Sequence, residues 1–86
     1  MKEEIKQKLN ITIDKYLKGS YSEKDFHENL SSLSLGITEL ELLNLREFLE
    51  VIEGQLERID FLVDEKEKPK KYRQVIVELK LFLEHL

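Results

Sequence analysis

The sequence predicts an all-α protein, a compact and mostly antiparallel four-helix bundle with a short second helix and a long third helix. Apolar residues recur every three or four positions along most of the 86-residue chain, and no segment alternates like a strand. One proline and three glycines leave room for few turns. The length fits a single domain, residues 1–86. The helices are predicted at about residues 2–18, 23–33, 39–64 and 69–86.

The junction between the first two predicted helices carries a stop signal followed by a start signal. Gly19 follows the last turn of the first helix, where glycine adopts a left-handed conformation at little cost. Ser22 is a predicted N-cap, and Asp25 is its capping-box partner three residues later. Tyr21 and Phe26 occupy the two positions of a hydrophobic staple around this cap. The first two helices are therefore expected to meet at a defined turn.

The third helix is predicted to begin with a second capping box. Thr38 is the expected N-cap, and Glu41 is its partner three residues later. Ile37 and Leu42 take the staple positions on either side. This start signal places the beginning of the third helix at residue 39.

Within the third helix, apolar residues alternate spacings of three and four without a break, which is the a/d seam of heptad repeats. Phe48 and Leu62 are expected to widen this seam on one side. Gly54 lies at an outward heptad position, away from the seam, at a cost of about 1 kcal/mol relative to Ala. The seam consists of Leu42, Leu45, Leu49, Ile52, Leu56, Ile59 and Val63.

The fourth helix is predicted to start at Pro69, because a proline in the first helical turn loses no intrahelical hydrogen bond. Val77 and Leu81 form a second apolar strip almost opposite its buried face. This strip predicts either a central helix or an interface between two copies of the chain, a possible homodimer through Val77 and Leu81. The buried face is expected to contain Tyr72, Val75, Ile76, Leu79, Phe82, Leu83 and Leu86.

The composition excludes several kinds of function. The chain has no cysteine and only two histidines, which rules out thiolate chemistry and zinc sites built from Cys and His. Neither His27 nor His85 follows an acid by three residues, as in di-iron bundles, so both are expected on the surface. No serine has the partners of a catalytic triad, and no glycine-rich phosphate loop is present. We therefore expect no enzyme, no metal and no cofactor.

The net charge of −4 disfavours nucleic acid and acidic membranes as partners. No segment approaches the roughly 20 apolar residues that cross a bilayer, and the N-terminus lacks the apolar core of a signal peptide. A cytoplasmic location is the expectation.

Acidic residues are concentrated in the middle of the chain. Residues 39–67 hold ten acids and three bases, a net charge of −7, whereas the remaining residues carry a net charge of +3. Five of the acids repeat at three- and four-residue spacing on one side of the third helix, and a sixth flanks them. Phe61 lies among them, outside the apolar seam. The candidate partner-binding residues are Glu47, Glu50, Glu53, Glu57, Asp60, Phe61 and Asp64.

The acidic stripe has two further interpretations. It is a solvated helix face, or basic residues at the start of the fourth helix (Lys70, Lys71 and Arg73) neutralise it within the bundle. Phe61 has an alternative as well, namely covering the end of the fourth helix or the link around Pro69. A face with charge for steering and an aromatic ring for affinity favours a basic protein partner.

The pattern Tyr16-Leu17-x-Gly19-x-Tyr21-Ser22-x-x-x-Phe26 resembles the junction between the first two helices of small all-helical bacterial immunity proteins, the colicin D type and its contact-dependent growth-inhibition relatives. A final helix that ends in Leu79-x-x-Phe82-Leu83 is compatible with them. The resemblance implies an antitoxin-type inhibitor that binds a toxin nuclease domain with acids in place of substrate phosphates. The alternative is a self-associating structural or regulatory module.

Overall fold

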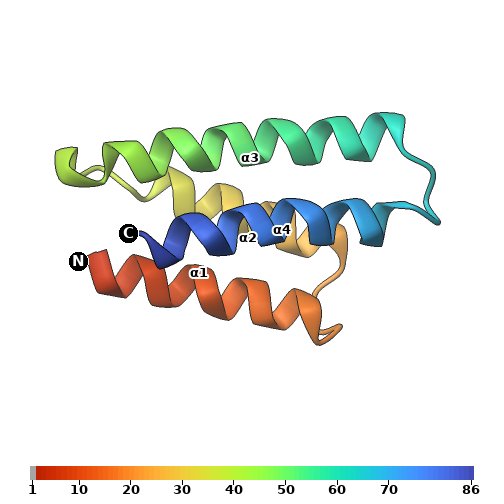
Figure 1. Cartoon of the computed structure of the whole chain (residues 1–86), viewed down its shortest axis with the longest axis horizontal. Helices are drawn as coiled ribbons and strands as arrows, with labels where there is room; N and C mark the ends of the chain where they lie inside the picture. The colour runs from red at the N-terminus through yellow and green to blue at the C-terminus, as the bar shows by residue number, and fades with distance from the viewer. Residues whose placement is uncertain (1) are drawn as a thin grey trace.

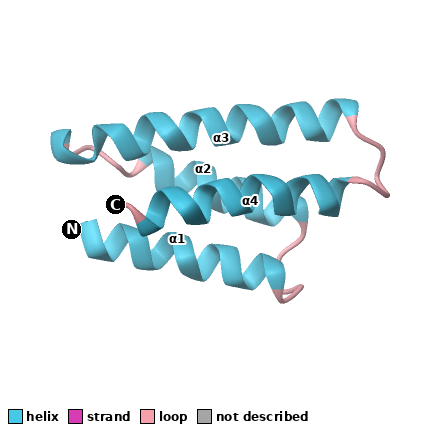
Figure 2. Cartoon of the chain, in the orientation of Figure 1, coloured by secondary structure: helices cyan, strands magenta, loops and turns pink. Residues whose placement is uncertain are grey.

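The computed structural model describes residues 2–86 and shows an all-α globule of four helices (Figures 1 and 2). A 3₁₀ turn, η1, precedes the third helix and is continuous with it, so that together they form the longest helical segment. The elements are α1 (Lys2–Leu17), α2 (Glu23–Leu35), η1 (Leu40–Leu42), α3 (Leu43–Leu62) and α4 (Lys68–Glu84). The predicted fold class is confirmed.

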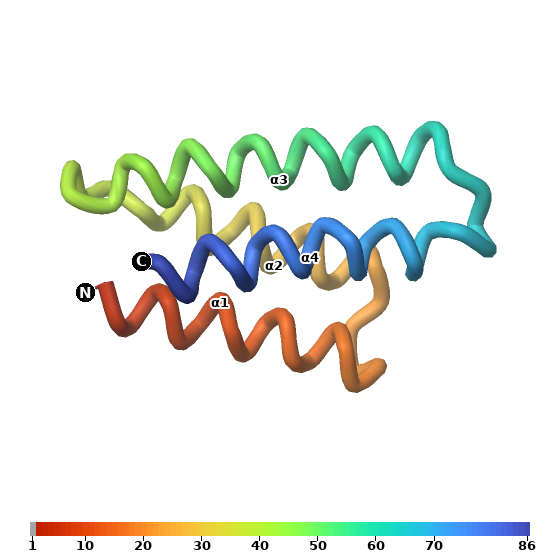
Figure 3. Tube along the Cα trace, in the orientation of Figure 1, coloured from red at the N-terminus to blue at the C-terminus, as the bar shows by residue number. Residues whose placement is uncertain are grey.

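Each helix packs against the next one along the chain, and α4 returns to contact α1 and α2. Successive helices run in opposite directions along the long axis, so the start of α1 and the end of α4 lie at the same end of the bundle (Figure 3). The molecule measures 38 × 23 × 21 Å. Since α3 has α2 on one flank and α4 on the other, it exposes a full-length outer side.

The junction between α1 and α2 forms as the sequence predicts. Gly19 has φ of 86°, the left-handed conformation that favours glycine. The Asp25 amide donates to Ser22 Oγ at 3.1 Å, and the Ser22 amide donates back to Asp25 Oδ2 at 3.3 Å, which completes the capping box. Phe26 is fully buried, and Tyr21 packs partly buried against the core. α2 runs to Leu35, two residues beyond its predicted end.

The start of the third helix differs from the prediction. Thr38 forms no capping box with Glu41; Glu39 is extended, and the chain makes a 3₁₀ turn before α3 begins at Leu43. Ile37 and Leu42 are both buried, at 4% exposure each, so the tighter turn satisfies the core contacts that the staple was expected to make. Hydrophobic burial therefore prevails over the side-chain cap.

α3 ends at Leu62, two residues before the prediction. Leu62 is 80% exposed, so the prediction that it widens the apolar seam is wrong. The chain turns extended at Val63 (φ −109°, ψ 138°), and Val63 packs against the core instead. Phe48 does widen the seam, because it stacks on Phe82 of α4 with ring centroids 4.1 Å apart.

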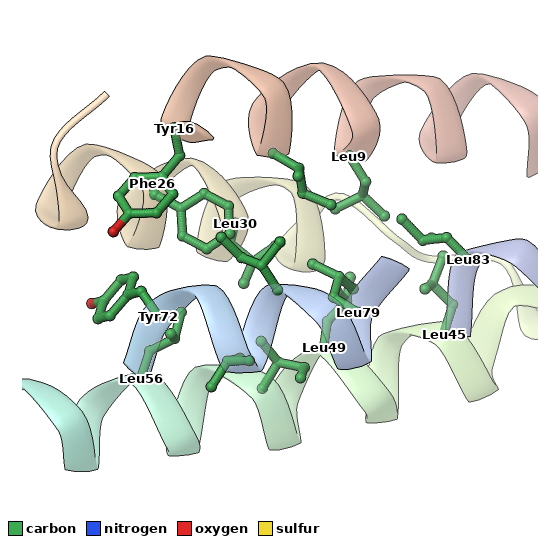
Figure 4. Close-up of a cluster of buried hydrophobic side chains, with 14 of the residues drawn as sticks. Leu9, Tyr16, Phe26, Leu30, Leu45, Leu49, Leu56, Tyr72, Leu79 and Leu83 are labelled. Atoms are coloured by element: carbon green, nitrogen blue, oxygen red, sulfur yellow. The ribbon is translucent and has the colours of Figure 1, made fainter. Parts of the chain in front are cut away.

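The core is one continuous cluster between the four helices (Figure 4). Three aromatic rings from different helices meet at one end: Tyr16, Phe26 and Tyr72, with centroids 5.3 to 6.2 Å apart. Leucines, isoleucines and one valine fill the rest, with Leu9, Leu45 and Leu83 at the other end. Burial of these side chains, each favourable by roughly 1.5–3 kcal/mol, turns the apolar side of every helix toward the core.

Replacing Gly54 by alanine is expected to stabilise the protein by about 1 kcal/mol, because alanine loses less backbone freedom in a helix. A Cβ built at Gly54 has no atom within 4 Å, so the added methyl meets no steric cost. Urea unfolding followed by circular dichroism measures the change. The matched control, Gly19→Ala, places a Cβ at φ of 86° and is expected to destabilise by about 1 kcal/mol. Equal effects of the two substitutions would contradict this account.

Candidate protein-binding face

Six of the seven predicted binding residues lie on α3, where they fall into two rows, and the seventh, Asp64, follows the end of the helix. Glu53 and Asp60, with Arg46 one heptad earlier, form a row that borders α2, and we call it the inner row. The remaining positions point away from the core and have exposed side chains. We call this second set the outer face; it consists of Glu47, Glu50, Glu57, Phe61 and Asp64.

Each member of the inner row contacts α2 or the segment that follows it. Arg46 Nη1 donates to the Ile37 carbonyl oxygen at 3.2 Å. Glu53 accepts a hydrogen bond from the Ser31 hydroxyl. Asp60 accepts from the Tyr72 hydroxyl of α4 at 2.8 Å, and His27 Nδ1 lies 3.5 Å from its second carboxylate oxygen. The inner row therefore holds α2, α3 and α4 together.

These contacts bear on two expectations. Glu53 and Asp60 are half-buried and engaged inside the bundle, so less of each side chain is available to a partner, and their role in binding stays a prediction. His27 is not an ordinary surface residue, because its side chain is only 18% exposed and faces Asp60. Both differences have one cause: the helical wheel gives angles around α3 but does not say that α2 lies on the side of the inner row.

The outer face keeps its negative charge. Within residues 2–86, no Lys, Arg or His nitrogen lies within 4.0 Å of the carboxylates of Glu47, Glu57 or Asp64. Glu50 pairs only with Arg46, its neighbour one turn earlier, at 3.6 Å. In the same described range, Lys70, Lys71 and Arg73 form no ion pair with the acids of the stripe. The alternative in which the start of α4 neutralises these acids through ion pairs is therefore not supported.

Phe61 is 87% exposed and stands between the acids near the end of α3. The alternative that it covers the end of α4 or the link around Pro69 is therefore wrong. An exposed ring of this size gains nothing from the fold, since its apolar surface stays in water. The outer face thus combines uncompensated carboxylates with an unburied aromatic side chain on one helix.

A shallow groove of about 830 Å³ lies beside this face, between α2 and the link from α3 to α4. Its charges are mixed: Lys68 binds Glu65 at 2.9 Å, and this hydrogen bond raises the pKa of the Lys68 ammonium. The lining residues are Ser22, Glu23, Lys24, His27, Glu28, Ser31, Ser32, Asp60, Glu65 and Lys68. Sequence patterns did not indicate this groove, because it depends on the packing of α2 against the end of α3.

Two tyrosine hydroxyls near this groove are permanent hydrogen-bond donors. Burial, and then the hydrogen bond to Asp60, raises the pKa of Tyr72 well above its usual value of 10. Burial and the 2.6 Å hydrogen bond to Glu23 act in the same direction on the pKa of Tyr16. Both hydroxyls therefore remain protonated and act as neutral donors.

Two other findings concern the described residues as a whole. Across residues 2–86, no group of three or more His, Asp or Glu side chains is placed to hold a metal ion. None of the helices in that range is both long and apolar enough to cross a membrane.

Tyr72→Phe is expected to destabilise the protein by about 1 kcal/mol, because the ring keeps its core contacts while Asp60 loses a buried donor. Urea unfolding measures the loss. Tyr21→Phe is the matched control, because no side-chain hydrogen bond joins Tyr21 to the described part of the chain, and we expect a change below about 0.5 kcal/mol. In an Asp60→Asn background, the loss of unfolding free energy caused by Tyr72→Phe should differ from the loss in the parent. If the losses of unfolding free energy from the two substitutions simply add, the proposed Tyr72–Asp60 coupling is absent.

Comparison with known proteins adds no family to these observations. No protein-family model, curated protein or solved structure matches the chain. The resemblance to immunity proteins therefore remains a prediction from the residues around Gly19 and Ser22. Any function has to be argued from the outer face of α3 and the contacts that orient it.

Proposed function

We propose that this chain is an immunity-type binding protein that neutralises a basic toxin domain, a nuclease, through the outer face of α3. The observation that carries the proposal is the outer face itself, which combines four exposed carboxylates with a phenylalanine that is 87% exposed. The resemblance at the α1–α2 junction points to the same class of protein. On this proposal the chain has no catalytic role and acts in the cytoplasm.

The charge of α3 suits such a partner. A nuclease binds phosphates with a basic cleft, and carboxylates on a rigid helix occupy that cleft as substrate phosphates would. Complementary fields of this kind speed association by roughly 10–10³-fold at low salt. Phe61 then supplies apolar contact area, as aromatic anchors do in many interfaces.

The fold alone does not account for these charges. Like charges one turn apart on a helix destabilise it by a few tenths of a kcal/mol per pair, and Glu50 and Glu57 both lie within one turn of Glu53. Arg46 offsets part of this at Glu50, and Ser31 offsets part at Glu53. Glu47, Glu57 and Asp64 have no such compensation within residues 2–86. A basic partner would replace this repulsion between carboxylates with attraction to its own positive charges.

Charge reversal of the three unpaired acids tests the proposal. The partner for this test is to be sought in the gene immediately upstream, as a basic toxin domain. We expect the triple variant Glu47→Lys, Glu57→Lys, Asp64→Lys to associate with that domain at least tenfold more slowly at low salt. The fold should survive, because all three side chains are exposed. Stopped-flow or surface-plasmon kinetics give the rate, and a nuclease assay gives the loss of inhibition.

The control carries the same change in net charge on other faces: Glu28→Lys, Glu78→Lys and Glu84→Lys, all at exposed positions. We expect this variant to retain most of the association rate. Equal slowing in both variants would show a non-specific charge effect and overturn the assignment of the face. An upstream gene without a basic domain, or a basic domain that does not bind, would contradict the proposed function itself.

Self-association is a second candidate function, favoured by one observation. Val77 and Leu81, one turn apart on α4, are 57% and 52% exposed, so the bundle leaves this apolar strip partly uncovered. The proposed inhibitor needs no dimer, and we expect sedimentation of a monomer at tens of micromolar. A dimer that Leu81→Lys dissociates, with unchanged helical content, would favour the self-associating module instead.

A further inference from the structure

Gly54 is a feature of α3 that the fold does not require. It lies in the middle of the helix on the outward side, at an exposed position. A Cβ placed there meets no atom within 4 Å, and among residues 2–86 only Gly19 adopts a positive φ. Neither crowding nor backbone conformation explains a residue that weakens the helix. An explanation has to come from outside the chain.

The surroundings of Gly54 leave a short stretch of bare helix backbone on the outward side of α3. The residues three and four positions away on either side are Glu50, Val51, Glu57 and Arg58, and all four are exposed. Residues at these spacings are neighbours on a helix surface, but none of their side chains comes within 4 Å of a Cβ at Gly54, so the space above the backbone is open. Val51 is 57% exposed and gives this bare stretch an apolar edge.

A bare stretch of backbone one residue long suits a helix that crosses α3 better than an extended chain that follows it. Two crossing helices touch most closely at one point, and the side chains at that point set their separation, commonly 8–10 Å between axes. A glycine there allows the closest approach. An extended segment lying along α3 would rest on many side chains and gain little from one missing Cβ.

We propose that the partner contacts this face with a basic α-helix that crosses α3 at Gly54, an inference that rests on the proposed function. Charge complementarity argues for this occupant, because two acids, Glu50 and Glu57, flank the bare stretch one turn away on the same side of α3, against one base, Arg58, on the other side. Phe61 lies two turns further on, about 10 Å along the axis at 1.5 Å per residue. It provides a second contact on the crossing helix or the segment beside it.

A series of side chains of increasing size at position 54 tests the inference. Its readout is the affinity for the same basic toxin domain that the charge-reversal test uses. Gly54→Ala is expected to weaken binding several-fold, and Gly54→Gln at least tenfold, because each side chain pushes the crossing helix further from α3. Both residues are better helix formers than glycine, so both variants should resist urea better than the parent. Binding that falls while stability rises separates this role from a structural one. Isothermal titration gives the affinities.

Gly36→Ala is the matched control, because it adds the same methyl group at the end of α2, with only ordinary contacts of 3.5 Å or more. It should leave affinity within twofold of the parent. If neither substitution at position 54 weakens binding while reversal of the three unpaired acids does, the crossing helix is wrong and the proposed function stands. If neither the size series nor the charge reversal changes binding, both fail.

Discussion

The half-buried carboxylate of Asp60 is the contact on which the orientation of α3 depends. It accepts from Tyr72 of α4 at 2.8 Å and faces His27 of α2 at 3.5 Å, so one side chain of α3 is held from both neighbouring helices. A helix with a continuous apolar seam is otherwise able to roll by small angles while its leucines stay buried. Because Asp60 is held in this way, its neighbour Phe61 is directed outward, and the part of the outer face that lies on α3 has a fixed direction relative to the bundle.

The chemistry of these contacts preserves the charge of the helix. Buried carboxylates need hydrogen-bond donors, and a lysine or arginine would meet that need while cancelling the negative field. Here the donors to Asp60 and Glu53 are the hydroxyls of Tyr72 and Ser31, which bring no charge. The raised pKa of Tyr72 keeps its hydroxyl protonated, so the donor is permanent. The inner row is thus satisfied structurally, while its carboxylates still add to the field of the outer face.

The sequence predicted the local features well and the neighbours of each helix poorly. The capping box at Ser22 and the left-handed Gly19 depend on residues within one turn, and both form as expected. Helical spacing gives Glu53 and Asp60 an angle from the apolar seam, whereas their environment depends on which helix packs at that angle. Thr38 failed as a cap for a related reason, since burial of the residues around it is a tertiary constraint that a local motif does not contain.

Three residues on the outward side of α3 lower the stability of the protein without serving the fold. Glu57 has no ion pair within residues 2–86, Gly54 weakens a helix that has room for a side chain, and Phe61 leaves its ring in water. Each of them alone is unremarkable, since single surface residues are often unfavourable by tenths of a kcal/mol. All three lie on the outward side of one helix, within seven residues of Gly54. A partner that supplies positive charge, a close backbone approach and an apolar contact would offset all three costs at once.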